Sequence, residues 1–266
     1  MGTAGTVRSV TDDELVAVLD EAVAAVRDAL DALAEWGPAG TRPGQYHTDL
    51  VADAAAVAVL EAAGLGVVSE ESGLHHPERG LQAVLDPVDG STNAAHGLPW
   101  YATSLCVLDD HGARAAVVVN QATGECFRAV RGAGATLDGF AIRPSSCERL
   151  SRAVVGLSGW PRHHLGWAQM RAYGAAALDL CSVACGRLDA YVDCGGGHAP
   201  WDYLGGMLVC HEAGAVVADV AGGDLVTAGM ADRRIVAGAA TPVLLRELIA
   251  ARRVLDEAAP GGTVPG

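Results

Sequence analysis

The sequence predicts a mixed α/β fold, and the order of its helical and strand-like segments carries that prediction. Residues 11–64 show helical periodicity, and short apolar strands separated by turn residues follow over 67–130. Beyond an Arg-Pro-Ser-Ser crossover, strands and helices alternate. We therefore expect an N-terminal α+β half over residues 1–145 and a C-terminal α/β half over 146–257, followed by a flexible tail over 258–266.

Two helices open the chain. Thr11 begins a capping box, and apolar residues at helical spacing extend the first helix to about Glu35. A loop rich in glycine and proline then separates it from a second helix. This second helix is expected to start near Thr48 or Asp49 and to carry Asp53 in its first turn.

Turn residues divide the rest of the chain into short elements. In the first half, strands are expected over 67–68, 83–85, 102–108, 113–119 and 125–130, with a hairpin turn over 132–137. In the second half, strands are expected over 153–157, 189–192, 215–219 and 235–237, and helices over 175–185, 203–212 and 242–253.

Composition narrows the possible functions. Half of the 266 residues are hydrophobic, which allows a sizeable core. All 18 basic residues are arginine, which excludes a lysine-dependent phosphate loop, a Schiff base and a lysine general base. The net charge of −14 disfavours nucleic acid and anionic membranes as partners, although metal ions would still let the protein accept a phosphate ester. No segment approaches the roughly 18 apolar residues of a membrane span, and seven cysteines without a Cys-x-x-Cys pair favour reduced thiols in the cytoplasm.

The most informative segment runs from Ala83 to Asn93. Its pattern predicts an apolar strand that ends on two carboxylates, Asp86 and Asp89, and then turns at Gly90 into a Ser-Thr-Asn helix start. Such a turn can hold a hard cation beside exposed backbone N–H groups, which can receive a phosphate. The segment is not an EF-hand, because its second position is proline and the spaced acidic ligands are missing.

Further carboxylates stand near the ends of other predicted elements. Glu70 and Glu71 end the preceding strand, Asp202 starts a helix after a Pro-Trp pair, and Asp53 lies in the helix that leads to Glu70. Taken singly, each fits an ordinary turn, helix cap or solvated charge. Carboxylates that converge must share protons or bind cations, and oxygen ligands favour Mg²⁺, Mn²⁺ or Ca²⁺ over zinc.

Three stretches resemble the inositol monophosphatase family of magnesium-dependent phosphomonoesterases. They are Glu-Glu-Ser at 70–72, Asp-Pro-Val-Asp-Gly-Ser-Thr-Asn at 86–93, and Trp-Asp at 201–202 followed by His-Glu-Ala-Gly-Ala at 211–215. The similarity extends over about residues 12–250. It implies a layered αβαβα sandwich of the sugar-phosphatase type, hydrolysis of a small phosphate monoester by a metal-activated water, and a homodimer.

The resemblance also implies roles for individual residues. Two or three Mg²⁺ ions would be bound, and Mn²⁺ could replace them. Their ligands would be the side chains of Glu70, Asp86, Asp89 and Asp202 and the backbone carbonyl of Val88. Asp53 and Ser91 would orient and deprotonate the attacking water. Glu71 would be a further catalytic carboxylate. It would either contact the metal ligands without binding a metal itself or bind a weaker third metal ion. Backbone N–H groups of Gly90, Ser91 and Thr92 would hold the phosphate.

The alcohol-binding side departs from the family pattern. Gly174, Ala175 and Ala176 stand where the family has Gly-Ser-Ala, so a hydroxyl is lost at these substrate-binding positions. Asp193 corresponds to an acidic substrate residue, but a glycine-rich and lengthened loop over 194–200 separates it from the Trp-Asp pair. The phosphate machinery is therefore expected to be intact, and the pocket for the alcohol altered.

Two other departures affect the assignment of site and substrate. The segment over 158–171 is shortened, and the threonine that often precedes the catalytic aspartate is absent before Asp53. We expect myo-inositol 1-phosphate or a related polyol or sugar phosphate as the substrate. Histidinol phosphate, fructose 1,6-bisphosphate and 3′-phosphoadenosine 5′-phosphate are alternatives, and a non-catalytic metal- or ligand-binding relative and a phosphotransferase are rival functions.

Some polar residues have open interpretations. His75 and His76 lie in a solvated loop or gate the site, and Arg171 forms a structural ion pair or reaches the substrate. Glu212 is expected to pack or cap locally, because the second histidine of a zinc-protease helix is missing.

Overall fold

The structure is a computed structural model that describes residues 10–42 and 44–257, with side chains described as far as residue 253. Its helices are α1 (Asp12–Asp31), α2 (His47–Ala62), α3 (Ser91–Ala95), α4 (Ala176–Ala184), α5 (Pro200–Ala213) and α6 (Pro242–Glu257). Its strands are β1 (Gly66–Ser69), β2 (Gly73–His75), β3 (Gln82–Asp89), β4 (Ala102–Asp109), β5 (Gly112–Asn120), β6 (Cys126–Val130), β7 (Gly134–Leu137), β8 (Phe140–Ala141), β9 (Val154–Ser158), β10 (Gln169–Arg171), β11 (Ala190–Asp193), β12 (Val216–Asp219) and β13 (Val236–Ala239).

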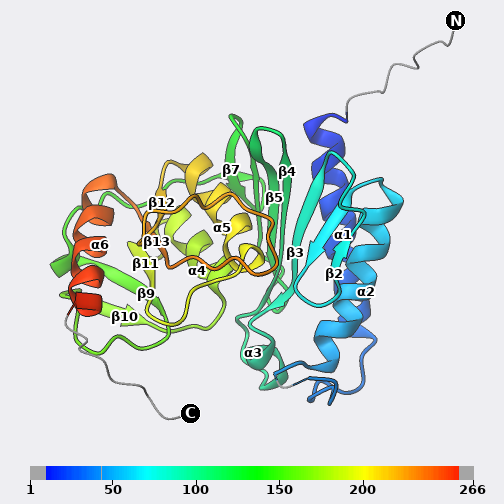
Figure 1. The fold of residues 1–266 in the computed structure, drawn as a ribbon, viewed down its shortest axis with the longest axis horizontal. Coiled ribbons are helices and arrows are strands. Elements are labelled where there is room, and N and C mark those ends of the chain that lie inside the picture. The colour runs from blue at the N-terminus through cyan, green and yellow to red at the C-terminus, as the bar shows by residue number, and fades with distance from the viewer. Residues whose placement is uncertain (1–9, 43, 258–266) are drawn as a thin grey trace, which may run out of the picture.

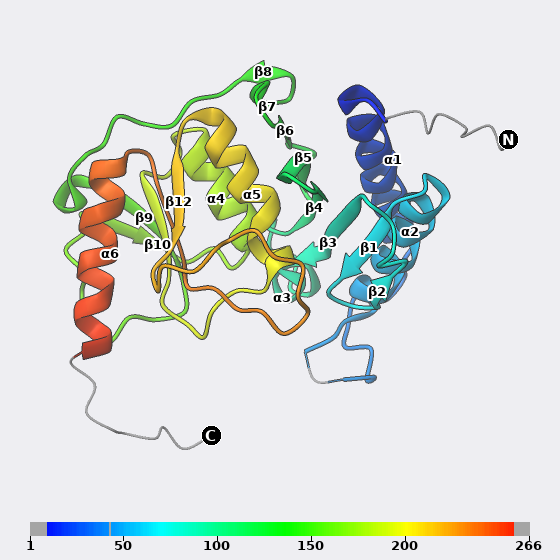
Figure 2. The ribbon, with the colours of Figure 1, turned by 45° about the horizontal axis from the view of Figure 1, so that its top comes forward.

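These elements stack in five layers (Figures 1 and 2). Helices α1 and α2 cover one face of an eight-stranded sheet, and α4 and α5 lie between its other face and a five-stranded sheet. Helix α6 covers the outer face of the second sheet. The αβαβα sandwich predicted from the sequence is therefore confirmed, whereas the predicted domain boundary at residue 145 stays a prediction.

Three apolar cores hold the layers together. Leu19 and Leu60 belong to the core under α1 and α2, and Leu204 belongs to the core around α4 and α5. Leu244 belongs to the core under α6. Each of these leucines is completely buried, which stabilises the fold by about 1.5–3 kcal/mol per side chain. The periodic apolar positions of the helices thus account for the layering.

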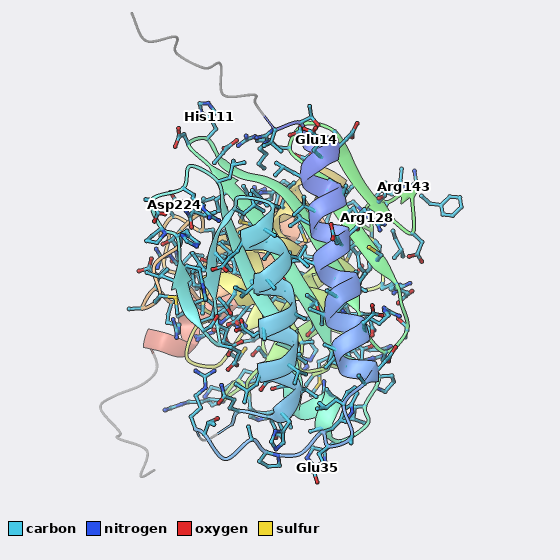
Figure 3. The ribbon with its side chains drawn as sticks, turned by 90° about the vertical axis from the view of Figure 1, so that its right-hand side faces the viewer. Glu14, Glu35, His111, Arg128, Arg143 and Asp224 are labelled. Carbon is cyan, nitrogen blue, oxygen red and sulfur yellow. The ribbon has the colours of Figure 1, made fainter. Side chains whose placement is uncertain are left out.

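Figure 3 views the molecule onto the outer helical layer, where α1 and α2 lie side by side across the first sheet. Polar side chains complement the apolar packing at its edge. The Arg128 guanidinium of β6 donates to the Asp20 carboxylate of α1, with a 2.9 Å Nε–Oδ1 distance. The ion pair thus links α1 to the sheet strand that it covers.

The sheets differ in topology. The first has the order β2-β1-β3-β4-β5-β6-β7-β8, and only β1 and β3 run parallel as neighbours. The second has the order β10-β9-β11-β13-β12, with β9 parallel to both β10 and β11. Since parallel neighbours end at the same edge, the ends of β1 and β3 bring their following residues together.

Some element boundaries differ from the prediction. Helix α1 ends at Asp31 rather than near Glu35, and α2 begins at His47, so Asp53 lies in its second turn. Residues 134–137 form strand β7 rather than a turn. The short strands β2, β8 and β10 were not predicted, because runs of two or three residues carry too little periodicity. The predicted flexible tail over 258–266 lies outside the described residues.

In the part of the chain that the structure describes, no helix combines the length and apolarity needed to cross a bilayer.

Candidate active site

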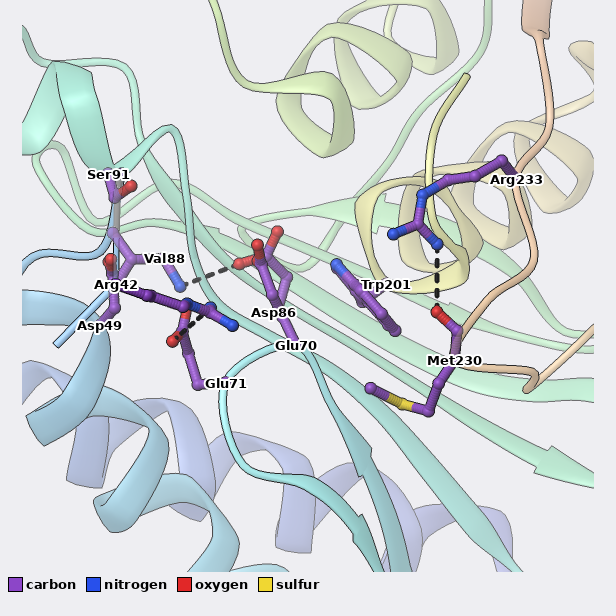
Figure 4. Close-up of a pocket in the computed structure, with 11 residues that line it drawn as sticks. Arg42, Asp49, Glu70, Glu71, Asp86, Val88, Ser91, Trp201, Met230 and Arg233 are labelled. Atoms are coloured by element: carbon purple, nitrogen blue, oxygen red, sulfur yellow. Dashed lines mark hydrogen bonds and ion pairs between the residues drawn. The ribbon is translucent and has the colours of Figure 1, made fainter. Parts of the chain in front are cut away.

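Two neighbouring cavities meet at the ends of β1 and β3. The first, which we call the arginine cavity, has a volume of about 450 Å³ and is lined by Arg42 and Arg233 among others (Figure 4). The second, which we call the α4 cavity, has a volume of about 240 Å³ and is bordered by residues at the start of α4. Both cavities are lined by Glu70, Asp86, Val88 and Ser91. Four of the predicted site residues therefore lie where the two cavities join.

The backbone explains why these residues point to one place. Strand β1 pairs in parallel with β3, and the Glu70 N–H beyond its end donates to the Leu85 carbonyl at 3.2 Å. Strand β3 then shifts register against β4 between Asp86 and Asp89. A β-bulge of this kind bends the strand and redirects its side chains. The two aspartates of the motif consequently face the same region from one irregular strand end.

Carboxylates from three distant stretches come together here. One oxygen from each of Glu70, Asp86 and Asp202 lies within 4.8 Å of the other two. Burial, with repulsion from Asp202, raises the pKa of Glu70 to about 7. Burial, with repulsion from Glu70, also raises the pKa of Asp86. Buried negative charges this close repel one another, and their all-oxygen donor set fits a hard divalent cation.

Two of the motif carboxylates, Asp89 and Asp202, accept hydrogen bonds from backbone donors. The Ala177 N–H, in the first turn of α4, donates to Asp89 Oδ2 at 2.7 Å. The Ala199 N–H donates to Asp202 Oδ2 at 2.9 Å, and His198 Nδ1 lies 3.2 Å from the same oxygen. Burial and repulsion from Asp202 raise the pKa of Asp89. Both carboxylates line the α4 cavity together with Asp86.

A left-handed glycine makes the turn that follows the motif. Gly90 has a φ of +88°, and a Cβ there would lie 3.0 Å from the carbonyl oxygens of Gly174 and Trp100. Only glycine fits both the conformation and the close approach. Gly90 and Ser91 line the α4 cavity, whereas Thr92 lies outside both lining sets and has its hydroxyl 3.4 Å from the Tyr46 hydroxyl.

The structure does not bring Asp53 to the two cavities. Asp53 lines neither cavity, and its buried carboxylate accepts a hydrogen bond from the Ser69 hydroxyl, which itself accepts from the Glu71 N–H at 3.1 Å. Asp49 lines the arginine cavity instead, on the same side as Ser91 (Figure 4). The first turn of α2 carries Asp49, and Asp53, which was expected in that turn, lies one turn further along the helix.

A signal for Asp49 was present in the sequence. The threonine expected before the catalytic aspartate stands at Thr48, directly before Asp49. Burial raises the pKa of the Asp49 carboxyl to about 6, against the lowering effect of a 2.8 Å hydrogen bond from the Tyr46 N–H. Glu71 lies beside it and accepts hydrogen bonds from Gln45 and, at 2.6 Å, from Arg42. A buried carboxyl with a near-neutral pKa suits proton transfer.

The residues on the alcohol side divide into two groups. Gly174, Ala175 and Ala176 line the α4 cavity, as their predicted role requires. Asp193 does not line it, because its carboxylate turns into its own loop and accepts the N–H groups of Gly195 at 2.7 Å and Gly197 at 2.9 Å. The lengthened glycine-rich loop thus withdraws this carboxylate from the cavity.

Other residues line the α4 cavity that the sequence did not single out. They include Asp179, Tyr191 and His198. The Tyr191 hydroxyl lies 2.6 Å from His198 Nε2, and the Trp100 indole donates to Asp179 at 3.0 Å. Burial raises the pKa of Asp179 to about 8. The spacing of His198 four residues before Asp202 was the only sequence hint of this group.

The polar residues for which the sequence left two interpretations open lie outside the two cavities. Neither His75 nor His76 lines the two cavities, and His75 lies in β2. Arg171 donates to the Met170 carbonyl and the Gln169 amide oxygen. Glu212 accepts the backbone N–H groups of Gly132 and Gly134 at the β6–β7 turn, so the capping it provides is of a distant turn and not the local capping that was predicted.

Comparison with known proteins extends this picture. Residues 46–257 match the model of the inositol monophosphatase family. The Nus factor SuhB of Salmonella typhimurium is 35% identical over 173 residues, which cover 59% of this chain and 64% of that protein, just under two thirds of its length. The fructose-1,6-bisphosphatase/inositol-1-monophosphatase of Methanothermobacter thermautotrophicus is 34% identical over 200 residues, which cover 66% of this chain and 71% of that protein.

Solved structures show the same architecture. The crystal structure of the extragenic suppressor protein suhB from Bartonella henselae is 26% identical, with a TM-score of 0.77 over 90% of this chain and 98% of that chain. The inositol monophosphatase TM1415 of Thermotoga maritima, at 23% identity, shares the fold with a TM-score of 0.77 over 93% of this chain and 99% of that chain. With the family model spanning most of the sequence, this chain belongs to the inositol monophosphatase family.

Proposed function

We propose that this protein hydrolyses a small phosphate monoester with the help of Mg²⁺. The observation that carries the proposal is the convergence of Glu70, Asp86 and Asp202 within 4.8 Å at the junction of two cavities. Membership of the family supports the same class of reaction. A divalent ion bound there would neutralise the phosphate and lower the pKa of a coordinated water.

We assign the metal-holding residues as the family resemblance implies, and the convergence of Glu70, Asp86 and Asp202 supports this assignment. Glu70, Asp86 and the Val88 carbonyl would hold one Mg²⁺, and Asp86, Asp89 and Asp202 a second, with Mn²⁺ as a substitute and Glu71 beside a weaker third site. The backbone bonds from Ala177 and Ala199 keep two of these carboxylates in place without blocking their remaining oxygens.

We assign proton transfer to Asp49 rather than Asp53. Asp49 and Ser91 line the arginine cavity beside Glu70, where they could orient a water for attack on phosphorus. Burial brings the pKa of Asp49 to about 6, close enough to neutrality for it to accept a proton. The N–H groups of Gly90, Ser91 and Thr92 would hold the phosphate at the start of α3.

The alcohol would leave into the α4 cavity. Gly174, Ala175 and Ala176 line this cavity, whereas Asp49 lines only the arginine cavity. A polyol or sugar phosphate such as myo-inositol 1-phosphate is our first candidate. Histidinol phosphate, fructose 1,6-bisphosphate and 3′-phosphoadenosine 5′-phosphate remain candidates. The homodimer, the cytoplasmic location and the lack of a nucleic-acid partner stay predictions from the sequence.

The experiment that tests this proposal measures the rate of phosphate release from p-nitrophenyl phosphate and from myo-inositol 1-phosphate, with and without Mg²⁺. The proposal predicts release that requires Mg²⁺ and is lost in Asp86→Asn. Asp110→Asn is the matched control, since it removes the same charge from an exposed turn. Well-folded protein that releases no phosphate at any Mg²⁺ level would refute the proposal.

A second candidate function is a protein that kept the fold and lost turnover. The curated relatives named Nus factor SuhB give this candidate its support. The same assay decides between the two, because a binding protein would bind Mg²⁺ without hydrolysing any ester. Product analysis with an added alcohol acceptor separates hydrolysis from phosphotransfer.

A further inference from the structure

Two buried polar side chains stand in an apolar layer behind the carboxylates of the site. Thr103 of β4 is completely buried and lies on the same face of the sheet as Leu105 and Val107, which belong to the core under α1 and α2. Gln121 follows the end of β5 and is 8% exposed. A buried hydroxyl or amide costs stability unless it is hydrogen-bonded, so the partners of these two side chains decide whether they are tolerated.

The Thr103 hydroxyl is held between two partners. It donates to the Pro87 carbonyl at 2.9 Å and accepts from Gln121 Nε2 at 2.9 Å. Because the hydroxyl has a single proton, the bond from Gln121 directs that proton to Pro87. The register shift of β3 places Pro87 and Val88 opposite the single residue Thr103. Thr103 thus ties the bulge in β3 to the neighbouring strand.

The peptide bond after Pro87 carries this contact to a carboxylate of the site. Its carbonyl oxygen accepts from Thr103, and its N–H, which belongs to Val88, donates to Asp86 Oδ1 at 3.0 Å (Figure 4). A peptide unit is planar, so its C=O and N–H groups turn together. The Thr103 hydroxyl therefore fixes the direction from which Asp86 receives its hydrogen bond. A carboxylate held in this way keeps one orientation, and its remaining lone pairs can face a cation.

An unpaired atom at the start of this chain of hydrogen bonds supports a role beyond packing. In the part of the protein that the structure describes, Gln121 Oε1 is one of two buried side-chain atoms without a hydrogen-bond partner. An unpaired buried acceptor destabilises a fold, and an apolar side chain would avoid that cost. The Gln121 N–H₂ group instead orients Thr103, and all three hydrogen bonds donate toward Asp86. Aligned donors of this kind strengthen one another.

We propose that Thr103, oriented by Gln121, is a positioning residue that sets the Asp86 carboxylate for a divalent cation. The inference rests on the proposed function and adds two residues that line neither cavity and that no sequence motif indicated. Neither of them would touch the cation or the substrate. They act through the peptide unit between Pro87 and Val88.

Isothermal titration calorimetry with Mg²⁺ tests this role in the whole chain. Thr103→Val keeps the shape of the side chain and removes the hydroxyl. It should weaken Mg²⁺ binding by about tenfold to a hundredfold, the range for partners that orient metal ligands. Thr103→Ser restores the hydroxyl and should restore most of the affinity. Thr136→Val, the same change at a half-buried position of β7, is the matched control and should leave the affinity unchanged.

A double variant separates positioning from stability. Thr103→Val leaves the Gln121 amide without its acceptor, so urea unfolding should show a loss of stability. Adding Gln121→Met replaces that amide by an apolar side chain and should recover part of this loss, while Mg²⁺ binding stays weak. If Thr103→Val does not fold, Gln121→Met alone is measured. It frees the Thr103 hydroxyl from its orienting donor and should weaken Mg²⁺ binding to a smaller extent.

The outcomes separate this inference from the proposed function. A folded Thr103→Val variant that binds Mg²⁺ as tightly as the native protein would overturn the inference and leave the metal centre standing, and so would unchanged affinity in Gln121→Met where that variant carries the test. A Thr103→Ser variant as weak as Thr103→Val, or a double variant that regains affinity together with stability, would assign the pair to the fold alone, which also overturns it. A native protein without saturable Mg²⁺ binding would refute the metal centre itself, and the proposed function would fail together with this inference.

Discussion

Replacing Asp49 with asparagine should stabilise the metal-free protein while nearly abolishing its activity. Burial raises the pKa of this carboxyl from 3.8 to about 6, so the folded state holds its proton more tightly than the unfolded state. The protonated Asp49 side chain therefore favours the folded state. This contribution to the free energy of unfolding is fully present below the unfolded pKa of 3.8 and is lost as pH rises through about 6. The ionised side chain opposes folding by about 3 kcal/mol at most, or on the order of 2 kcal/mol after solvent screening.

Asparagine removes that charge and can still accept the hydrogen bond from the Tyr46 N–H. Urea unfolding at about pH 8 in a chelator should therefore show Asp49→Asn to be more stable than the native protein. Loss of a general base should lower kcat by about 10²–10⁴-fold in Mg²⁺-dependent phosphate release.

Asp53→Asn is the matched comparison, since it makes the same change one helical turn away. Its carboxylate accepts a hydrogen bond from the Ser69 hydroxyl in a buried site, and asparagine puts an N–H₂ donor where a carboxylate oxygen stood. We expect a loss of about 1–3 kcal/mol in stability with kcat nearly unchanged. A large loss of turnover in Asp53→Asn, or near-normal turnover in Asp49→Asn, would refute the reassignment.

Four further predictions concern the rest of the site. Asp89→Asn should lower turnover by more than about 10²-fold without unfolding the protein, and near-normal turnover would contradict its role as a metal ligand. Ala175→Ser should shift the preference among phosphate esters without changing the Mg²⁺ requirement, and an identical ester profile would remove it from the alcohol pocket. Gly90→Ala should cost on the order of 2 kcal/mol or more in urea unfolding, and more than Gly97→Ala, which has a φ of +70° but open space around it; equal costs would disprove the close approach. Because burial raises the pKa of Glu70 to about 7, metal-free stability should fall as pH rises through that value. Mg²⁺ should then raise the melting temperature more at about pH 8 than at about pH 6, and a larger effect at the lower pH would contradict this sign.

The layered fold could be predicted because its elements are long and periodic. The apolar positions of α1 at Leu15, Leu19 and Leu30 are all buried, as helical spacing requires. The strands of the first sheet followed from apolar runs between turns. Very short strands such as β10 could not be predicted, since their pairing is decided by neighbours far away in the chain.

Some residues of the candidate site could likewise be predicted from the sequence, and others could not. Local motifs were sufficient to place Glu70, Asp86 and Asp202 near one another, because each ends or starts an element at the same edge of the fold. The choice between Asp49 and Asp53 depended on one turn of helix, which propensity does not resolve. The direction of the Asp193 carboxylate depended on backbone donors in an irregular loop, and no periodic pattern encodes them.

The same limit applies to the cavities. That Arg42 and Arg233 line one cavity, and that two loops touch at Gly159 and Gly195, are consequences of packing between segments far apart in sequence. The family was therefore accessible from the sequence, and the lining of the cavities was not.

The most direct test of the central claim is Mg²⁺ binding measured by isothermal titration calorimetry. If Glu70, Asp86 and Asp202 form one divalent-cation centre, the native protein should bind Mg²⁺ saturably. Asp86→Asn, which replaces the most deeply buried carboxylate of that centre, should keep the circular dichroism spectrum and lose most of the affinity. A native protein that shows no saturable binding, or an Asp86→Asn variant that binds Mg²⁺ as tightly as the native protein, would contradict the account.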